Sequence, residues 1–249
     1  MTAPVFLVDP GLLDSSGPSG RLTLDGPEGR HAVSVRRLRE GEEIVLTDGA
    51  GRGAYGVVAG VVGKDVLNVE VSAVRDEPAP DPRITVVQAL PKGDRGELAV
   101  ETMTEAGVDV IVPWAAARCV TQWRGDRGAK SLAKWRATAR EAAKQSRRLR
   151  FPEVTEPVTT RQLAGLLGAA DFAGVLHEEG ATPLATAPLP AAGSLVLVVG
   201  PEGGVAPEEL AAFAETGAPP YRLGPTVLRT STAGVAAAAL LLTRTGRWA

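Results

Sequence analysis

The stretch Leu195-Val196-Leu197-Val198-Val199-Gly200-Pro201-Glu202-Gly203-Gly204 decides the fold of this chain. Its first five residues form a short apolar run typical of a buried strand, and its glycines let the backbone turn tightly. The next predicted helix begins at Pro207, a favoured first helical residue, with two glutamates in the same turn. A buried strand that leads through a glycine turn into a helix indicates an α/β fold.

A second glycine-bearing loop runs from Leu223-Gly224 to Ala233 and also joins a short buried strand to a helix. Free N–H groups at helix starts, together with glycines that allow close approach, favour a pocket lined by main chain. The first loop lacks the spacing of known phosphate-binding motifs, and Glu202 would repel a polyanion. A neutral or cationic ligand therefore fits better. Two tight turns without any ligand are the alternative.

Residues 83–249 alternate between strand-like and helix-like patterns, which predicts a mostly parallel sheet covered on both faces. The strands are expected at 84–90, 108–113, 174–176 and 195–199. The helices are expected at 97–106, 129–149, 161–167, 207–215 and 230–243.

Residues 1–75 carry short β-like runs separated by turn signals, which predict a small closed barrel. A short helix at 31–39 would bring His31, Arg36 and Arg37 close together. The proline-rich stretch 76–82 indicates a linker. The strands of the barrel are expected at 5–8, 21–24, 43–47, 54–62 and 66–74.

The bulk composition limits the possible functions. At 249 residues and 44% hydrophobic content the chain can form two modest domains, and a net charge of −2 restricts nucleic-acid contact to local patches. One cysteine, no signal-like start and no apolar run near the roughly 20 residues that span a bilayer indicate a cytoplasmic protein without a membrane role. His31, His177 and Cys119 lack metal-ligand spacing, so we expect no metal.

The helix expected at 129–149 carries the clearest charged patch, with Glu141 as its only acid. A buried stripe at steps of three and four residues is expected at Leu132, Trp135, Ala139, Ala142, Ser146 and Leu149. The neighbouring face would present Arg136, Arg140, Lys144 and Arg147, which can track a phosphate backbone. A solvated basic face is the alternative, but so one-sided a charge favours RNA or DNA.

Two further features lie near the predicted pocket. Arg229 is a permanent cation beside residues that can cap the next helix, and it could polarise a carbonyl or hold a phosphate. An exposed salt bridge is the competing interpretation. His177 and Glu178 follow the strand that ends at Leu176, so we expect them at the same sheet edge as the two loops, or in a plain strand-end loop.

Three segments together resemble the pocket of the SPOUT methyltransferases: Leu176-His177-Glu178-Glu179, Val199 to Gly204, and Leu223 to Ala233. The strongest resemblance is to the RsmE family, which methylates N3 of a uridine in 16S ribosomal RNA. Further similar segments follow in order along nearly the whole chain, at 31–41, 88–93, 105–108, 118–120 and 141–147.

The resemblance implies an N-terminal PUA-like barrel (1–75), a linker (76–82) and a C-terminal α/β SPOUT domain with a trefoil knot (83–249), in an obligate homodimer. It also implies that S-adenosylmethionine binds in the knot, in agreement with the loop chemistry, because this cofactor is a cation without phosphate. The residues expected to bind it are Leu176, His177, Glu178, Val199, Gly200, Pro201, Glu202, Gly203, Leu223, Gly224, Leu228, Thr230 and Ala233.

An in-line methyl transfer to N3 requires the loss of its proton, and Arg229 is our candidate for stabilising the charge that develops on the uridine carbonyls. Ser231 stands where the family commonly has glutamate. The resemblance implies that the partner is 16S rRNA in the small ribosomal subunit. The alternatives are a ribose 2′-O-methyltransferase and a non-catalytic assembly factor that binds RNA. The candidates for RNA contact are His31, Arg36, Arg37, Lys92, Arg118, Arg136, Arg140, Lys144, Arg147 and Arg148.

Overall fold

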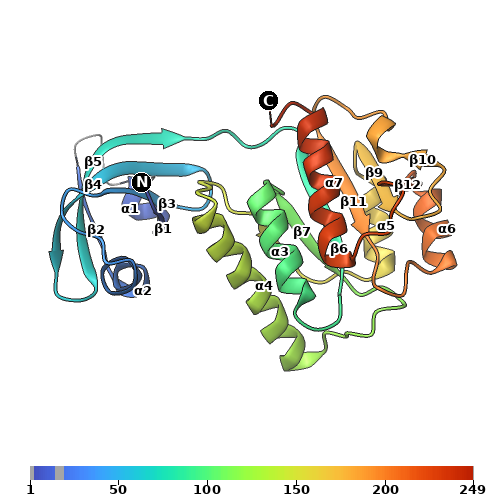
Figure 1. Cartoon of the computed structure of the whole chain (residues 1–249), viewed down its shortest axis with the longest axis horizontal. Helices are drawn as coiled ribbons and strands as arrows, with labels where there is room; N and C mark the ends of the chain where they lie inside the picture. Colours follow the sequence, from blue (N-terminus) through green and yellow to red (C-terminus); the bar gives the residue numbers. More distant parts are fainter. Residues whose placement is uncertain (1–2, 15–19, 249) are drawn as a thin grey trace. The chain divides into compact units, whose positions relative to one another are not determined.

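The computed structural model describes residues 3–14 and 20–248, and these form two compact units (Figure 1). The first unit holds the described residues up to Ala79 together with the segment Ala143–Phe151. The second unit holds Pro80–Ala142 and the chain from Pro152 onward. Each unit has its own apolar core, so each is described separately below.

The first unit is built on a five-stranded sheet in the order β1-β3-β4-β5-β2. Strand β1 pairs parallel with β3, and the other neighbours are antiparallel. The sheet covers a core that includes Phe6, Leu46 and Leu67, all at most 1% exposed. Its strands are β1 (Val5–Leu7), β2 (Arg21–Leu24), β3 (Glu43–Thr47), β4 (Arg52–Val62) and β5 (Val66–Asp76).

The helix predicted at 31–39 begins earlier and ends earlier. A short helix α1 (Pro10–Asp14) precedes it; α2 (Gly26–Arg30) then continues without a break as a π-helical turn, His31–Val35. Pro27 and Glu28 in the first turn favour this early start. Arg37, whose φ is 57°, ends the helical segment.

The segment 143–151 packs in the first unit, although the sequence prediction places it in the α/β domain. Lys144 Nζ donates to Glu28 Oε1 at 2.8 Å, and Thr47 Oγ1 donates to the Leu149 carbonyl at 2.8 Å. The Leu149 side chain is 3% exposed. Helix α4 (Gly125–Gln145) therefore begins in the second unit, and its last residues belong to the first.

The second unit contains a seven-stranded sheet in the order β10-β12-β9-β11-β6-β7-β8, and every adjacent pair is parallel. This confirms the predicted parallel sheet. Residues Leu195–Val199 are at most 3% exposed, which explains their uninterrupted apolar pattern. The strands are β6 (Arg83–Ala89), β7 (Val110–Trp114), β8 (Glu153–Val154), β9 (Phe172–Leu176), β10 (Thr182–Pro183), β11 (Ser194–Val199) and β12 (Pro220–Arg222).

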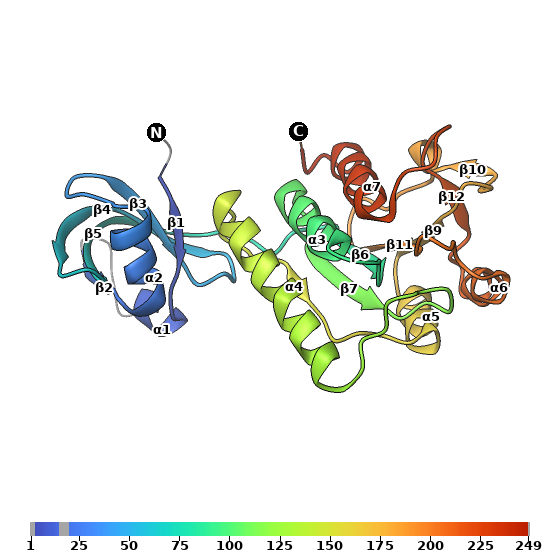
Figure 2. The same cartoon turned by 60° about the horizontal axis from the view of Figure 1, so that its bottom comes forward.

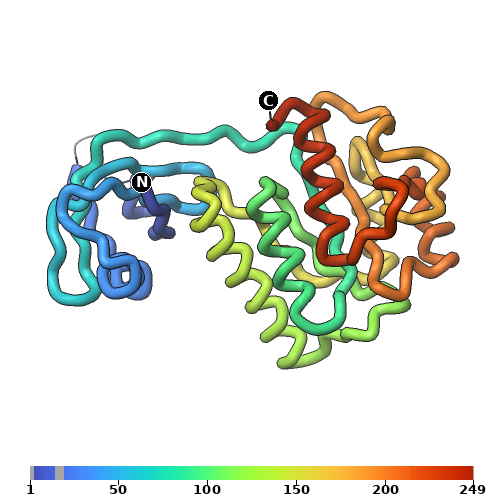
Figure 3. The backbone as a smooth tube through the Cα atoms, viewed as in Figure 1, coloured from blue at the N-terminus to red at the C-terminus, as the bar shows by residue number. Residues whose placement is uncertain are grey.

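Helices cover both faces of this sheet. Helices α3 and α7 run side by side against β6 and β11, as the ribbon and the backbone trace both show (Figures 1 and 3). Helices α5 and α6 pack together on the opposite face (Figure 2). Their bounds are α3 (Arg95–Ala106), α5 (Thr160–Gly168), α6 (Pro207–Glu215) and α7 (Thr230–Arg244), with a 3₁₀ turn at Leu184–Thr186. None of the helices in 3–14 and 20–248 is long and apolar enough to cross a membrane.

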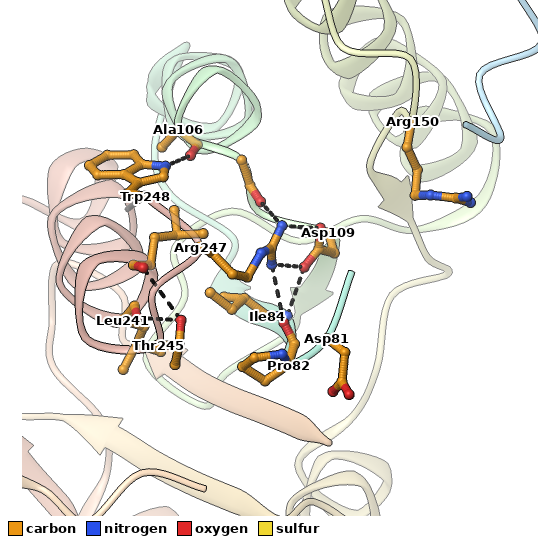
Figure 4. Close-up of polar contacts among 12 residues, drawn as sticks. Asp81, Pro82, Ile84, Ala106, Asp109, Arg150, Leu241, Thr245, Arg247 and Trp248 are labelled. Atoms are coloured by element: carbon orange, nitrogen blue, oxygen red, sulfur yellow. Dashed lines mark hydrogen bonds and ion pairs between the residues drawn. The ribbon is translucent and has the colours of Figure 1, made fainter. Parts of the chain in front are cut away.

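The end of α7 is fastened to the sheet by Arg247 (Figure 4). Its guanidinium donates to both carboxylate oxygens of Asp109, with a distance of 3.1 Å to Oδ1, and to the Pro82 carbonyl. Asp109 also accepts a hydrogen bond from Ile84 N at 2.8 Å. Because α7 carries Thr230 at its other end, this contact helps to fix where the second glycine loop joins the helix.

Candidate functional site

A cavity of about 350 Å³ opens where β9, β11 and β12 end. Parallel strands bring their carboxyl ends to one edge of a sheet, where ligands of α/β folds commonly bind. The residues that line the cavity are the last residues of these strands and the segments that follow them, with Arg95 from α3 and Thr230 and Ala233 from α7.

The structure brings together all but one of the residues predicted to bind the cofactor. The exception is Gly203, which does not line the cavity and whose carbonyl accepts a hydrogen bond from Arg118 at 3.1 Å. Arg229 lines the cavity as well. The predicted residues on its wall are Leu176, His177, Glu178, Val199, Gly200, Pro201, Glu202, Leu223, Gly224, Leu228, Thr230 and Ala233.

Sequence reasoning missed several residues of the wall. Arg95 begins α3, and Arg222 belongs to β12, a strand of three residues. A strand so short carries no clear periodicity, and the position of Arg95 depends on how the strands neighbour one another in the sheet. The missed residues are Arg95, Val205 and Arg222, whereas Gly204, Thr226 and Val227 lie in the predicted pocket segments but were not among the residues predicted to bind the cofactor.

The loop after β11 requires glycine at two positions. A Cβ on Gly200 would lie 2.8 Å from Cγ2 of Val205, closer than a methyl group and a side chain can approach. Gly204 has a φ of 73°, a conformation that other residues rarely adopt. The loop therefore keeps bare backbone against the cavity, as its sequence predicted.

The two pocket loops are joined by a hydrogen bond. Thr230 is the first residue of α7, and its hydroxyl donates to the Gly200 carbonyl at 2.9 Å. The N-cap of the helix is Arg229, and no side chain caps it. The residues after Arg229 that could have capped this helix, Thr230, Ser231 and Thr232, do not cap it, because all three lie inside the helix.

Charges of both signs surround the cavity. Glu202 accepts a hydrogen bond from Lys92 N at 3.2 Å and lies 3.9 Å from the Arg95 guanidinium. Glu178 and Arg222 are exposed on its wall. A ligand that carries both a cationic centre and a carboxylate finds partners here.

Arg229 is exposed, and its guanidinium makes no hydrogen bond or ion pair within residues 3–14 and 20–248. The salt-bridge alternative for this residue therefore has no partner in the part of the chain that the structure describes. Ser231, by contrast, is 3% exposed and does not line the cavity. Arg222, which also lines the cavity, has no ion-pair partner among the described residues either, but Arg229 is the one of the two that the sequence singled out.

Cys119 lies near the same edge but is not a reactive group. Its side chain is 9% exposed, and its thiol contacts the Trp114 carbonyl at 3.8 Å. Burial raises the pKa of the Cys119 thiol, and the nearby carboxylates of Glu209 and Glu202 act in the same direction. A thiol that stays protonated is a poor nucleophile.

The candidates for RNA contact divide between the two units. In the first unit Arg36, Arg37 and Arg147 are exposed, Arg148 is half-buried, and His31 packs edge-on against Phe6. Lys144 does not lie on the exposed face that the helical pattern predicted. Its side chain is 6% exposed and paired with Glu28, because the last turn of α4 packs within this unit.

In the second unit Lys92, Arg118, Arg136 and Arg140 are exposed. The Arg136 guanidinium is only partly available for RNA, since it forms an ion pair with Glu156 at 3.0 Å. The predicted buried stripe of α4 is confirmed at Leu132, Trp135, Ala139 and Ala142. Leu149 is buried as well, but it lies, like Ser146, beyond the end of the helix. No group of three or more His, Cys, Asp or Glu suited to a metal occurs among the described residues.

Two family models match the chain. One describes an RNA methyltransferase domain and covers residues 77–242, and the other describes an RNA methyltransferase PUA domain and covers residues 24–71. The fold and the two matches define a class, the RNA methyltransferases that carry a PUA domain.

Relatives narrow this class. The chain is 48% identical over 252 residues to ribosomal RNA small subunit methyltransferase E of Mycobacterium bovis, covering 100% of this chain and 94% of that relative. It is 32% identical over 219 residues to the protein of the same name from Bacillus subtilis, covering 85% of each. It therefore belongs to the ribosomal RNA small subunit methyltransferase E family, which confirms the resemblance to RsmE.

A solved structure supports the same family. Ribosomal RNA small subunit methyltransferase E from Neisseria gonorrhoeae, bound to S-adenosyl methionine, superposes with a TM-score of 0.82 at 28% identity and covers 98% of each chain. The likeness extends over both units.

Proposed function

We propose that this chain transfers a methyl group from S-adenosylmethionine to N3 of a uridine in 16S rRNA of the small ribosomal subunit. The observation that carries the proposal is the cavity at the ends of β9, β11 and β12, lined by the three segments that the sequence identified. Relatives named as small-subunit rRNA methyltransferases, and a similar structure bound to S-adenosyl methionine, support it.

The residues of the cavity fit this cofactor. A volume of about 350 Å³ lies in the range of small-molecule sites. The carboxylates of Glu178 and Glu202 suit a cation, and the bare backbone at Gly200 allows a flat base to approach closely. When bound, S-adenosylmethionine would supply an electrophilic methyl group on its sulfonium.

The remaining chemistry belongs to the protein. The wall of the cavity holds donor and acceptor in line, and such positioning supplies a large part of the rate in group transfer. The free guanidinium of Arg229 stabilises the negative charge that the uridine carbonyls gain as N3 loses its proton. A water or polar group at the cavity takes the proton. A stacked target base would first be extruded into the site.

The exposed arginines of the first unit would hold the RNA by its phosphates. We further propose that the protein works in the cytoplasm as a homodimer and that the domain at 83–249 contains a trefoil knot. Family membership supports these properties.

Small subunits isolated from a strain that lacks this protein provide the test. Incubation with the purified protein and S-adenosylmethionine, followed by nucleoside digestion and mass spectrometry, should yield N3-methyluridine at one mapped position. A ribose-methylated nucleoside would instead establish the 2′-O-methyltransferase. If calorimetry detects no binding of S-adenosylmethionine, the result favours an assembly factor without catalysis.

A further inference from the structure

Gln88 is a fully buried polar residue to which the proposed reaction gives no role. It lies near the end of β6, where it pairs in register with Val199, and its exposure is 0%. Its side-chain Nε2 donates to Thr230 Oγ1 at 2.9 Å and to the Ala89 carbonyl at 3.1 Å. Its Oε1 is buried and has no hydrogen-bond partner among the described residues.

The hydroxyl of Thr230 connects Gln88 to the first pocket loop through a second hydrogen bond. It has one proton, which it donates to the Gly200 carbonyl at 2.9 Å, so it accepts from Gln88. Amide, hydroxyl and carbonyl thus form one directed chain that links β6, the start of α7 and the loop after β11. Its last two members, Thr230 and Gly200, both line the cavity.

Core stability does not explain a glutamine at position 88. A buried acceptor without a partner is unfavourable, and an apolar side chain of similar shape avoids that loss. The amide instead orients the Thr230 hydroxyl, which an apolar side chain cannot do.

We propose that Gln88 is a positioning residue of the cofactor site. Through the Thr230 hydroxyl it sets the spacing between the loop at 200–204 and the start of α7, and with it the place of Arg229. The proposal rests on the proposed function, because it takes the cavity to be the S-adenosylmethionine site.

Three variants separate positioning from packing. Gln88→Met keeps the shape but removes the amide, Thr230→Val removes the hydroxyl, and Thr230→Ser retains it. Thr104→Val is the matched control, since it removes another buried hydroxyl, which donates to the Val100 carbonyl within α3. Each variant is measured for thermal midpoint, for amide hydrogen exchange without ligand, and for S-adenosylmethionine affinity by calorimetry.

Gln88→Met should keep or raise the thermal midpoint, speed exchange at residues 200–204 and 229–233, and weaken S-adenosylmethionine binding by about tenfold. Thr230→Val should speed exchange and weaken binding to the same extent, whereas Thr230→Ser should stay near wild type. The Gln88→Met/Thr230→Val double variant should bind S-adenosylmethionine no more weakly than Thr230→Val. Thr104→Val should leave loop exchange and affinity unchanged.

Wild-type exchange in both loops together with wild-type affinity in Gln88→Met overturns the proposal. If Gln88→Met does not fold, the contrast between Thr230→Val and Thr230→Ser decides instead, and equal behaviour of these two overturns it. If wild type itself binds no S-adenosylmethionine, the proposed function fails, whereas the exchange of the ligand-free loops still decides the role of Gln88.

Discussion

The two units differ in which residues adopt left-handed backbone. In the second unit every described residue with positive φ is a glycine, including Gly204 at the cavity. In the first unit two arginines, Arg37 and Arg147, have φ values of 57° and 61°. The cavity is thus made of unstrained backbone, whereas the first unit holds long cationic side chains on backbone that glycine would suit better.

Arg147 shows this contrast most clearly. Its N–H donates to the Lys144 carbonyl and the N–H of Arg148 donates to the Ala143 carbonyl, the pattern that commonly closes a helix on a glycine. A residue other than glycine in this conformation costs about 1 kcal/mol. The guanidinium of Arg147 has no partner among the described residues. An exposed guanidinium without a partner, held on strained backbone, is consistent with the RNA contact predicted for Arg147.

The largest effect is expected on methyl transfer, from a substitution at the cavity of the second unit. Arg229→Ala should lower methyl transfer by about 10²–10³-fold, because it removes the charge that stabilises the reacting uridine. The residue is exposed, so folding and S-adenosylmethionine affinity should stay near wild type. Single-turnover methylation and calorimetry on the same preparation measure the two effects. Methylation at the wild-type rate would remove Arg229 from the mechanism.

The next effect in size is a loss of stability when the ion pair near the end of α7 is removed. Arg247→Ala should lower the free energy of unfolding by about 2–3 kcal/mol, because it leaves the buried Asp109 carboxylate without its cation. Urea unfolding followed by circular dichroism measures the loss. Arg244→Ala is a useful comparison, since its partners are the neutral carbonyls of Leu184 and Ala187. A larger loss in Arg244→Ala would contradict the importance of the Asp109 contact.

Gly200→Ala tests the need for bare backbone at the cavity. The added methyl group would press on Val205, so the loop must shift and S-adenosylmethionine binding should weaken by about tenfold. Gly165→Ala is the control, because a Cβ there meets nothing within 4 Å. Calorimetry compares the two variants, and equal affinities would show that the loop accommodates a side chain.

The smallest expected effect concerns the strained backbone of Arg147 in the first unit. Arg147→Gly should raise stability by about 0.5–1 kcal/mol through relief of strain. It should also weaken RNA binding and reduce the slope of log K against log salt by about 0.7–0.9, the loss of one phosphate contact. Arg147→Lys keeps both charge and strain and should change neither. An unchanged salt slope in Arg147→Gly would place the residue outside the RNA interface.

Sequence reasoning located the cavity because its signals are local. Glycines at 200 and 204, the apolar run of β11 and the helix start at Pro207 each act within a few residues, and parallel strands then bring their ends together. Lys144 was misplaced for the opposite reason. Helical periodicity assigned it to an exposed face, but its partner Glu28 lies 116 residues away in the chain. Such a contact leaves no trace in a local pattern.

The placement of 143–151 in the first unit has a consequence for synthesis of the chain. Leu149 and Lys144 complete packing and charge pairing for strands and a helix that are translated much earlier. When the ribosome has released only the first 79 residues, this unit still lacks part of its apolar covering, and it stays incomplete until residue 151 has emerged. The nascent N-terminal part therefore has to wait, partly assembled, while the 72 residues from 80 to 151 are made.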